Sequence, residues 1–411
     1  MSPVGALVLA ALLGEHGLTV VADLLNLRAL DRGVPPELCA FYDGARYHRA
    51  QAYARAHTAL GLVASTVGLA ATLAFWFADG FDRLDGAVRG LALGPVGTGL
   101  VYIAILALAR VALALPFAWW STFVVEERFG FNRTSAWTFW TDRLKGALIG
   151  LAVGGPLLAA ILWLFTSGLG QAWLACWAMS TAAMVVMQLV APTWIMPLFS
   201  RFTPLAEGPL REAIVACAHA AGYPIDGVWV IDGSRRSTKA NAFFTGFGRH
   251  KRIALFDTLV ATLDPAAVVG VVAHEIGHYR CGHVAKGMVL GILHLGLVFL
   301  LFSVALRTPP LFAAFGVATP SVHVGLVVFG LLLTPLELGL SIALNAWSRR
   351  NEREADRFAV ATTGTGEPLA RGLKRLSADS LSTLTPHPLY VLLHYSHPPL
   401  LERLRALAAS A

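Results

Sequence analysis

The stretch with the clearest chemical content is His274-Glu275-Ile276-Gly277-His278. On a helix, the two histidines lie one turn apart on the same face and can bind one Zn²⁺ together. Glu275 points about 100° away from His274, so its carboxylate can reach a water on the metal rather than the metal itself. A metal that acidifies water and a carboxylate that accepts its proton are the minimal equipment for hydrolysing an amide at neutral pH.

A catalytic zinc needs three protein ligands and one open coordination position. The best source of a third ligand is the segment 351–356, where Glu352, Ala355, Asp356 and Ala359 share one face of a predicted helix. A carboxylate pair on a face lined by alanines points inward. Glu352 is then the expected zinc ligand. Asp356, one turn later, is expected to accept a hydrogen bond from a ligand histidine and so to orient its ring. The competing interpretation is a solvated helix start with mixed charges.

Other polar residues near these segments receive different interpretations. His283 lies five residues beyond His278, which rotates it off the ligand face of a continuous helix and makes it a helix-end residue. Arg110, His294 and Glu337 fall inside predicted membrane spans, where polar residues face a bundle interior or a water-filled cavity. A structural polar network explains these three residues equally well.

The composition places this chemistry in a membrane. Of the 411 residues, 56% are hydrophobic and only 14% are charged, whereas soluble domains carry about 25% charged residues. Basic loops that face anionic lipid explain the net charge of +7, and no basic helix or aromatic-basic surface indicates a nucleic-acid partner. Four cysteines without a C-x-x-C pair indicate neither a disulfide framework nor a thiolate zinc site.

Seven stretches are long and apolar enough to cross a bilayer, which predicts an all-α polytopic membrane protein. The first stretch contains Glu15, His16 and Asp23, but it lacks a basic n-region and a clear cleavage site, so we interpret it as a retained span. The expected spans are approximately 4–27, 59–79, 98–120, 146–167, 171–195, 284–306 and 323–346. They define a five-helix region 1–195, a catalytic segment 196–283, a two-span region 284–346 and a C-terminal helical segment 347–411.

The distribution of basic residues predicts the orientation of these spans. The loops after the first, third and fifth spans carry five, four and nine Lys or Arg residues, whereas the loops 80–97, 168–170 and 307–322 carry two, none and one. The positive-inside rule then places the N-terminus outside and the C-terminus in the cytoplasm. The segments 196–283 and 347–411 therefore face the cytoplasm together.

The segment 196–283 is predicted to be mixed α/β. The expected elements are a helix over 210–221, a strand over 227–232, and strands over 241–248 and 252–256 joined near Gly248–Lys251. Asp264 and Pro265 predict a helix start, with aspartate as N-cap and proline at the first helical position. A helix from Ala266 through His283 then carries the two histidines in its middle.

These stretches resemble the type 1 integral-membrane CAAX prenyl proteases, a family of seven-span zinc metalloproteases. The matching stretches follow one another along nearly the whole chain, which makes the resemblance specific. Besides the segments 274–278 and 352–356, the matching stretches are Val34-Pro-Pro-Glu-Leu38, Phe123-Val-Val-Glu-Glu127, Gly130-Phe-Asn132, Phe202-Thr-Pro-Leu205 with Glu207-Gly208, Asn241-Ala-Phe-Phe244, 251–259, Ser348-Arg-Arg350 and 394–403.

The resemblance implies seven tilted helices around a large water-filled chamber. A cytoplasmic α/β metalloprotease portion of the gluzincin-like type is implied at one end of the chamber. Within it, the resemblance assigns His274, His278 and Glu352 as ligands of one Zn²⁺ and Glu275 as the general base.

Three more residues match family positions near the site. His397 and Arg403 are implied to lie near the scissile bond, where a histidine or an arginine can donate to the developing oxyanion. Asn241 matches an asparagine beside the site. It also precedes a predicted edge strand that can pair with an extended substrate by strand addition.

The predicted function is therefore peptide-bond hydrolysis by a monomeric membrane zinc metalloendopeptidase. The expected partners are membrane lipid and a peptide or protein substrate, with or without a lipid modification. Compact loops and a composition rich in Ala, Gly, Arg and Leu favour a bacterial member in the inner membrane. Because bacteria generally lack protein prenylation, the alternative is a quality-control protease acting on non-prenylated peptides. The non-enzyme alternative is a transporter or channel with a structural zinc, which a closed four-ligand site would indicate.

Overall fold

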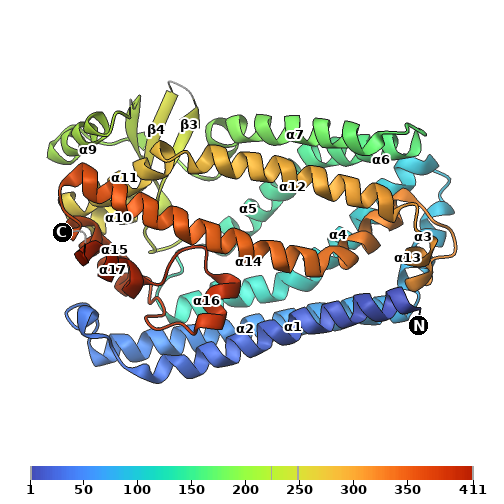
Figure 1. Cartoon of the computed structure of the whole chain (residues 1–411), viewed down its shortest axis with the longest axis horizontal. Helices are drawn as coiled ribbons and strands as arrows, with labels where there is room; N and C mark the ends of the chain where they lie inside the picture. The colour runs from blue at the N-terminus through green and yellow to red at the C-terminus, as the bar shows by residue number, and fades with distance from the viewer. Residues whose placement is uncertain (1, 224, 248–249, 410–411) are drawn as a thin grey trace.

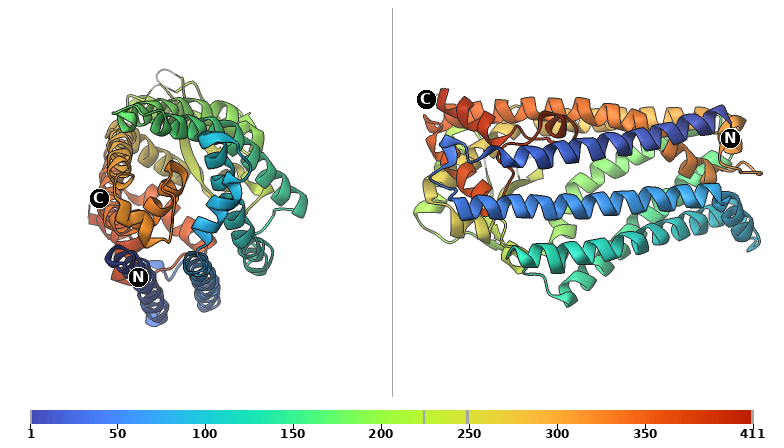
Figure 2. Two further views of the ribbon diagram at one scale, coloured as in Figure 1. Left: turned by 90° about the vertical axis from the view of Figure 1, so that its right-hand side faces the viewer. Right: turned by 90° about the horizontal axis from the view of Figure 1, so that it is seen from below.

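The computed structural model describes residues 2–223, 225–247 and 250–409. Within these residues, seven helices are long and apolar enough to cross a membrane, as the sequence predicts. They run along the long axis of the molecule, and the end-on view in Figure 2 shows them arranged around that axis. The helices of these spans are α1 (Pro3–Ala29), α2 (Gly44–Phe77), α4 (Gly94–Trp120), α5 (Ala136–Ile149) with α6 (Gly155–Thr166), α7 (Ala172–Val190), α12 (His283–Ala305) and α14 (Val322–Thr363).

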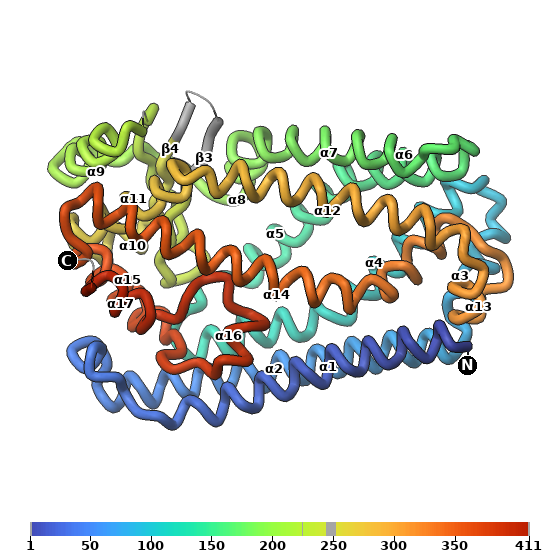
Figure 3. The backbone as a smooth tube through the Cα atoms, viewed as in Figure 1, coloured from blue at the N-terminus to red at the C-terminus, as the bar shows by residue number. Residues whose placement is uncertain are grey.

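Two of these helices extend well beyond the predicted spans. The side chain of Asp43 caps α2 by accepting a hydrogen bond from the Arg46 amide at 2.7 Å. The basic residues from Arg46 to Arg55 therefore lie on this helix rather than in a loop. The α14 helix continues without a break from the membrane to Thr363, as the tube in Figure 3 shows. Glu352 therefore belongs to the same helix as the seventh span, not to a separate element.

Proline and glycine shape the ends of several spans. Three spans widen into π-helical turns near such residues, which interrupt or loosen regular helical hydrogen bonding. These turns are η3 (Ser121–Glu126), η4 (Gly150–Gly154) and η5 (Ala191–Ile195). The remaining short elements of the membrane region are η1 (Leu30–Arg32), η2 (Pro36–Leu38), α3 (Gly80–Arg89), α8 (Met196–Phe199) and α13 (Pro309–Ala314).

A four-stranded sheet lies at one end of the bundle, with strand order β1-β2-β4-β3. The β2 and β4 strands are parallel, while β1 pairs antiparallel with β2 and β3 pairs antiparallel with β4. The predicted hairpin is present, with its residues 248–249 outside the described part of the chain, and β3 is an edge strand as expected. The bounds are β1 (Phe202–Pro204), β2 (Gly227–Ile231), β3 (Ala242–Phe247) and β4 (His250–Phe256).

The helix that carries the two histidines packs against this sheet. It is α11 (Pro265–Arg280), and the Asp264 side chain caps it by accepting from the Ala267 amide at 3.0 Å, as predicted. It ends earlier than predicted, because Gly282 adopts a left-handed conformation (φ 70°) and α12 begins anew at His283. Apolar residues of β2, β4, α9 (Pro209–Ala220), α11 and α15 (Glu367–Asp379) form the hydrophobic core between the sheet and these helices. The remaining helices of this end are η6 (Gly233–Arg235), α10 (Asp257–Thr262), α16 (Pro388–His394) and α17 (Leu400–Ala409).

The polar residues inside the spans are not placed alike. His294 Nε2 on α12 lies 3.3 Å from Glu337 Oε1 on α14, which is a direct link between two spans. Arg110 instead lines a cavity of about 730 Å³ between α2, α4 and α14. The structure thus contains both a polar network and a cavity within the bundle.

Candidate metal centre and active site

Three side chains that could bind a metal converge where α11 meets α14. Single ligand atoms of His274, His278 and Glu352 all lie within 4.8 Å of one another, and this is the one such group among the residues that the structure describes. The two histidine Nε2 atoms are 3.3 Å apart. Glu352 Oε1 lies 3.2 Å from His278 Nε2, and Glu352 Oε2 lies 3.4 Å from His274 Nε2. Two helices far apart in the sequence therefore supply one compact cluster.

This donor set fits zinc. Zinc–ligand bonds of about 2.0–2.1 Å in a tetrahedral arrangement separate neighbouring ligand atoms by roughly 3.3–3.4 Å, close to the observed spacings. Glu352 is also nearly fully buried, and its Oε2 atom has no hydrogen-bond partner among the described residues. An unpartnered buried carboxylate oxygen is costly in a protein interior, and a cation would satisfy it.

A glycine permits this close approach of the two helices. A Cβ atom on Gly277 would lie 3.0 Å from the Cα and 3.1 Å from the carbonyl oxygen of Ala355. Both neighbours are backbone atoms, which cannot move aside as a flexible side chain can. Gly277 and the small Ala355 thus let α14 bring Glu352 against the histidines of α11.

The second nitrogen of His274 is fixed by a buried ion pair. His274 Nδ1 lies 2.8 Å from Asp356 Oδ1, as expected for a carboxylate that orients a ligand histidine. Arg403 holds this carboxylate from its other side, with Nη2 2.6 Å from Oδ1 and Nε 2.9 Å from Oδ2. Burial alone would lower the pKa of His274, but the neighbouring carboxylates of Asp356 and Glu352 raise it.

Arg403, expected near the scissile bond, packs against the metal-ligand cluster. Only 8% of it is exposed, and its guanidinium contacts Asp356, the ring of His274 and, at 3.6 Å, the Glu352 carboxylate. It is not among the residues that line the cavity of about 930 Å³ next to His278 and Glu352. It therefore lies where it can support the metal ligands rather than reach a substrate carbonyl.

The second nitrogen of His278 is also occupied, by residues that the sequence analysis set aside. His278 Nδ1 lies 3.0 Å from His283 Nδ1, and His283 Nε2 lies 3.2 Å from Glu354 Oε2. The prediction treated His283 as part of one continuous helix, which turned it away from His278. Gly282 was the available signal, because a glycine at this position ends a helix and redirects the chain.

A cavity of about 930 Å³ opens beside the cluster. Glu275, His278, Glu352 and His397 line it on the side of the cluster. Burial raises the pKa of Glu275, and the neighbouring histidines oppose that shift. The rest of its lining includes apolar side chains from three helices and from β3, namely Pro192, Phe243, Val284, Met288 and Trp347. The cavity thus offers a polar, metal-binding wall and an apolar wall to one ligand.

His397 lines this cavity, whereas Asn241 lies beside it in the chain, two residues before Phe243. The His397 side chain is 64% exposed, and its Nε2 atom lies 3.2 Å from Glu352 Oε1. Asn241 Oδ1 accepts a hydrogen bond from the adjacent Ala242 amide at 2.9 Å. The edge strand that follows Asn241 meets the cavity through Phe243. His397 is therefore beside the cluster, while Asn241 shapes the start of β3.

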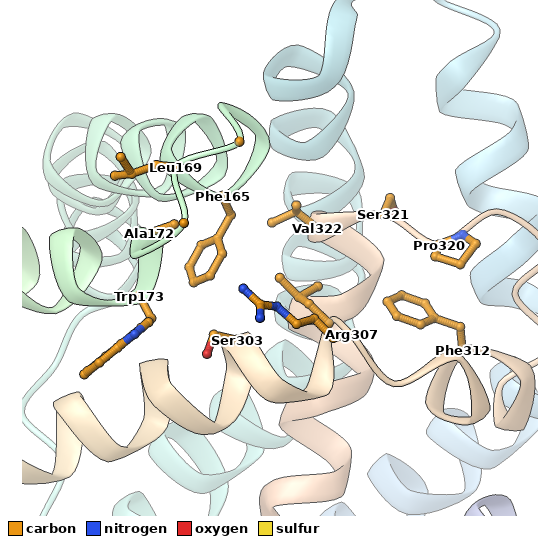
Figure 4. A pocket seen from close by; sticks show the side chains of 13 residues that line it. Phe165, Leu169, Ala172, Trp173, Ser303, Arg307, Phe312, Pro320, Ser321 and Val322 are labelled. Atoms are coloured by element: carbon orange, nitrogen blue, oxygen red, sulfur yellow. The ribbon is translucent and has the colours of Figure 1, made fainter.

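A smaller cavity of about 380 Å³ lies at the other end of the bundle (Figure 4). The Arg307 side chain points into it, near Ser303 and the aromatic ring of Phe165. None of the predicted site residues lines this cavity. The chemistry expected from the sequence is thus confined to the end that holds the sheet.

Comparisons with known proteins agree with this geometry. Residues 23–201 match the five membrane helices of the CAAX prenyl protease N-terminal region, and residues 204–411 match peptidase family M48. The chain is 35% identical to CAAX prenyl protease 1 homolog of Arabidopsis thaliana, over 94% of this chain and 93% of the relative. It is 34% identical to CAAX prenyl protease 1 of Saccharomyces cerevisiae, over 91% and 88%.

A solved structure supports the same assignment. The crystal structure of Ste24p from S. mikatae matches with a TM-score of 0.93 and 31% identity, over 99% of each chain. These matches do not favour a transporter or channel. The expected resemblance is thus confirmed, and the chain belongs to peptidase family M48 as an integral-membrane zinc metalloendopeptidase.

Proposed function

We propose that His274, His278 and Glu352 hold one zinc ion per chain and that a monomer cleaves an extended peptide beside it. The observation that carries this proposal is the convergence of these three side chains with Glu275 on one wall of a cavity of about 930 Å³. When bound, zinc acidifies water and polarises the carbonyl of the scissile amide. The proposal takes one chain as the active unit, because a single chain supplies the three ligands and Glu275.

Glu275 is the proposed general base. Its carboxylate faces the cavity, and burial raises its pKa toward the range that suits proton transfer near neutral pH. It accepts a proton from the attacking water and passes it to the leaving amine. His397, exposed to the cavity beside Glu352, donates a hydrogen bond to the developing oxyanion.

The remaining site residues position the substrate and the ligands. We assign Asp356 the orientation of His274, and Arg403 the support of Asp356. Asn241 starts the edge strand β3, whose free edge can pair with an extended peptide as an added strand. The side chains of that peptide then meet the apolar wall of the cavity.

The proposed substrate is a CAAX-type C-terminal peptide, as the names of the relatives suggest. From the basic loops we infer an N-terminus outside and an active site toward the cytoplasm, and from the composition a bacterial inner membrane. In that setting, the competing substrate is a non-prenylated peptide cleared by a quality-control protease. The apolar cavity wall accommodates a lipid or apolar side chains alike.

One experiment tests both the chemistry and the substrate. Purified protein is incubated with farnesylated and unmodified versions of one CAAX peptide, with and without a zinc chelator, and products are identified by mass spectrometry. We expect chelator-sensitive cleavage that is faster for the farnesylated peptide. Equal rates for the two peptides would favour the quality-control substrate, and cleavage that resists exhaustive chelation would refute the metallopeptidase mechanism.

The variant Glu275→Gln isolates the base. Removing a general base lowers the rate by roughly 10²–10⁴-fold, whereas the metal ligands stay intact. We expect loss of peptide cleavage with zinc content unchanged, measured by mass spectrometry of the metal. Full activity in this variant would show that another group accepts the proton.

A further inference from the structure

The segment that leads to His397 contains a short helix with exposed carbonyl groups at its end. The α16 helix spans only Pro388–His394, and Tyr395 ends it by donating its amide to the Val391 carbonyl at 3.1 Å. The last carbonyls of any helix lack partners within that helix. A helix of seven residues therefore depends on other elements to fix its C-terminal end at His394, three residues before His397.

Two polar side chains of α14 donate hydrogen bonds to the carbonyls at this end. Arg349 Nη1 donates to the Tyr395 carbonyl at 2.6 Å and to the Val391 carbonyl at 3.2 Å. Asn345 Nδ2 donates to the Leu393 carbonyl at 3.0 Å. A cation at a helix C-terminus is also favourable, because the partial charge there is negative. We refer to Asn345 and Arg349 as the α14 clamp.

The clamp and the metal cluster share one face of one helix. Asn345, Arg349, Glu352 and Asp356 follow one another at intervals of four, three and four residues, so they form a stripe along α14. The stripe holds α16 at its first two positions, reaches the metal cluster through Glu352, and contacts His274 and Arg403 through Asp356. A single rigid helix thus sets where His397 lies relative to Glu352.

The rest of the segment limits how far His397 can move. At the start of α16, the His387 amide donates to Asn26 Oδ1 of α1 at 3.0 Å, and Figure 1 shows α16 between α1 and α14. After His397, Pro398 and Pro399 restrict the backbone, and the Arg403 amide donates to the Pro399 carbonyl at 3.3 Å. The position of His397 therefore follows from the position of the end of α16.

We propose that Asn345 and Arg349 are positioning residues that hold His397 over the metal cluster. This proposal rests on the proposed role of His397 in peptide cleavage. The hydrogen bonds of the two clamp residues go to carbonyls of α16 and Tyr395, and neither residue lines the cavity beside the metal cluster. Their effect reaches the reaction through the backbone of 391–397.

The test uses Arg349→Gln, which shortens the side chain and removes the guanidinium that makes two of the hydrogen bonds, and Asn345→Leu, which removes the third hydrogen bond at similar volume. Since a shift of about 1 Å in a catalytic group can cost about 100-fold in rate, we expect Arg349→Gln to lower kcat roughly 10- to 100-fold. Zinc content and KM should stay near those of the wild type. Arg349→Lys, which keeps a charged donor, should recover part of the loss. Asn345→Leu should show a smaller decrease in kcat.

A matched control and a double variant separate positioning from general destabilisation. Arg353→Gln removes an exposed arginine from the next turn of α14, and we expect kcat within twofold of the wild type. Because the clamp acts through His397, adding Arg349→Gln to His397→Ala should lower kcat no further. Independent losses that multiply in the double variant, or a normal kcat in Arg349→Gln, would overturn the proposal.

The outcomes also separate this proposal from the proposed function. If Glu275→Gln is inactive and His397→Ala is impaired while Arg349→Gln is normal, the metallopeptidase mechanism stands and the clamp fails. If His397→Ala is as active as the wild type, the clamp fails with it, although the role of Glu275 is unaffected. Full activity of Glu275→Gln would instead count against the mechanism itself.

Discussion

Two buried histidine–aspartate pairs involve α14, one near each end of the bundle. At the sheet end, His274 Nδ1 lies 2.8 Å from Asp356 Oδ1, and at the opposite end His323 Nε2 lies 2.6 Å from Asp85 Oδ1. An arginine accompanies each aspartate, with Arg403 on Asp356 at 2.6 Å and Arg89 on Asp85 at 2.7 Å. The two clusters match in residue type and in the burial of the histidine and the aspartate, although Arg403 is buried and Arg89 is exposed.

The difference lies in which ring nitrogen the aspartate contacts, Nδ1 in His274 and Nε2 in His323. His274 directs its Nε2 atom at His278 and Glu352, at 3.3 Å and 3.4 Å. His323 uses the same Nε2 atom for Asp85 and for the Ser321 hydroxyl, at 3.2 Å. A buried histidine–aspartate pair thus becomes part of a metal site only when its other nitrogen converges with further ligands. The pair at the opposite end instead joins α3 to the start of α14.

Removing a ligand should give the largest contrast between the two ends. We expect Glu352→Ala to lose its zinc and all peptide cleavage, because two histidines alone do not complete a catalytic zinc site. Asp85→Asn, at the opposite end, should keep one zinc per chain and its activity. Metal content of the purified proteins measures both. A normal zinc content in Glu352→Ala would move the third ligand to another residue.

Neutralising each aspartate should give a smaller contrast between the two ends, with zinc affinity reduced only by the change at Asp356. Asp356→Asn leaves the ligands in place but weakens the orientation of His274, which we expect to lower zinc affinity about 10- to 100-fold. Asp85→Asn should leave zinc affinity unchanged and lower the thermal unfolding midpoint, because it weakens the buried hydrogen bond between Asp85 and His323. Competition with a chelator of known affinity and thermal unfolding distinguish the two. Equal zinc affinities in the two variants would mean that Asp356 is no more than structural.

The features that the sequence predicts well are those with local signals. Long apolar runs fixed the seven spans, and the Asp264-Pro265 pair fixed the start of α11. The carboxylate and alanine pattern around Glu352 pointed to the face that meets the histidines. The unbroken length of α14 was not predicted, although its signal was present: between Pro335 and Gly364 the chain has only one glycine, Gly339, and no proline.

The features that escaped prediction depend on where distant segments meet. Arg349 is one arginine among several on α14, and only the fold brings the end of α16 to it, 42 and 46 residues along the chain. Arg403 likewise reaches Asp356 across 47 residues. No periodicity within either segment encodes these contacts. His283 differs, since a single helix break at Gly282 was enough to reverse its predicted direction.

The smallest expected difference between the two ends concerns two tightly packed glycines, Gly277 and Gly99. A Cβ on Gly277 would press on the backbone of Ala355 at 3.0 Å, whereas a Cβ on Gly99 would meet the Leu162 Cδ1 atom at 2.8 Å and His323 Cβ at 3.1 Å. The Leu162 side chain can rotate away, but the backbone of α14 cannot. We expect Gly277→Ala to cost about 1–3 kcal/mol of unfolding free energy and to weaken zinc binding, because it separates α11 from α14. Gly99→Ala should cost less and leave zinc affinity unchanged. Equal zinc affinities in the two variants, measured by chelator competition, would show that the metal site tolerates a shift of α14.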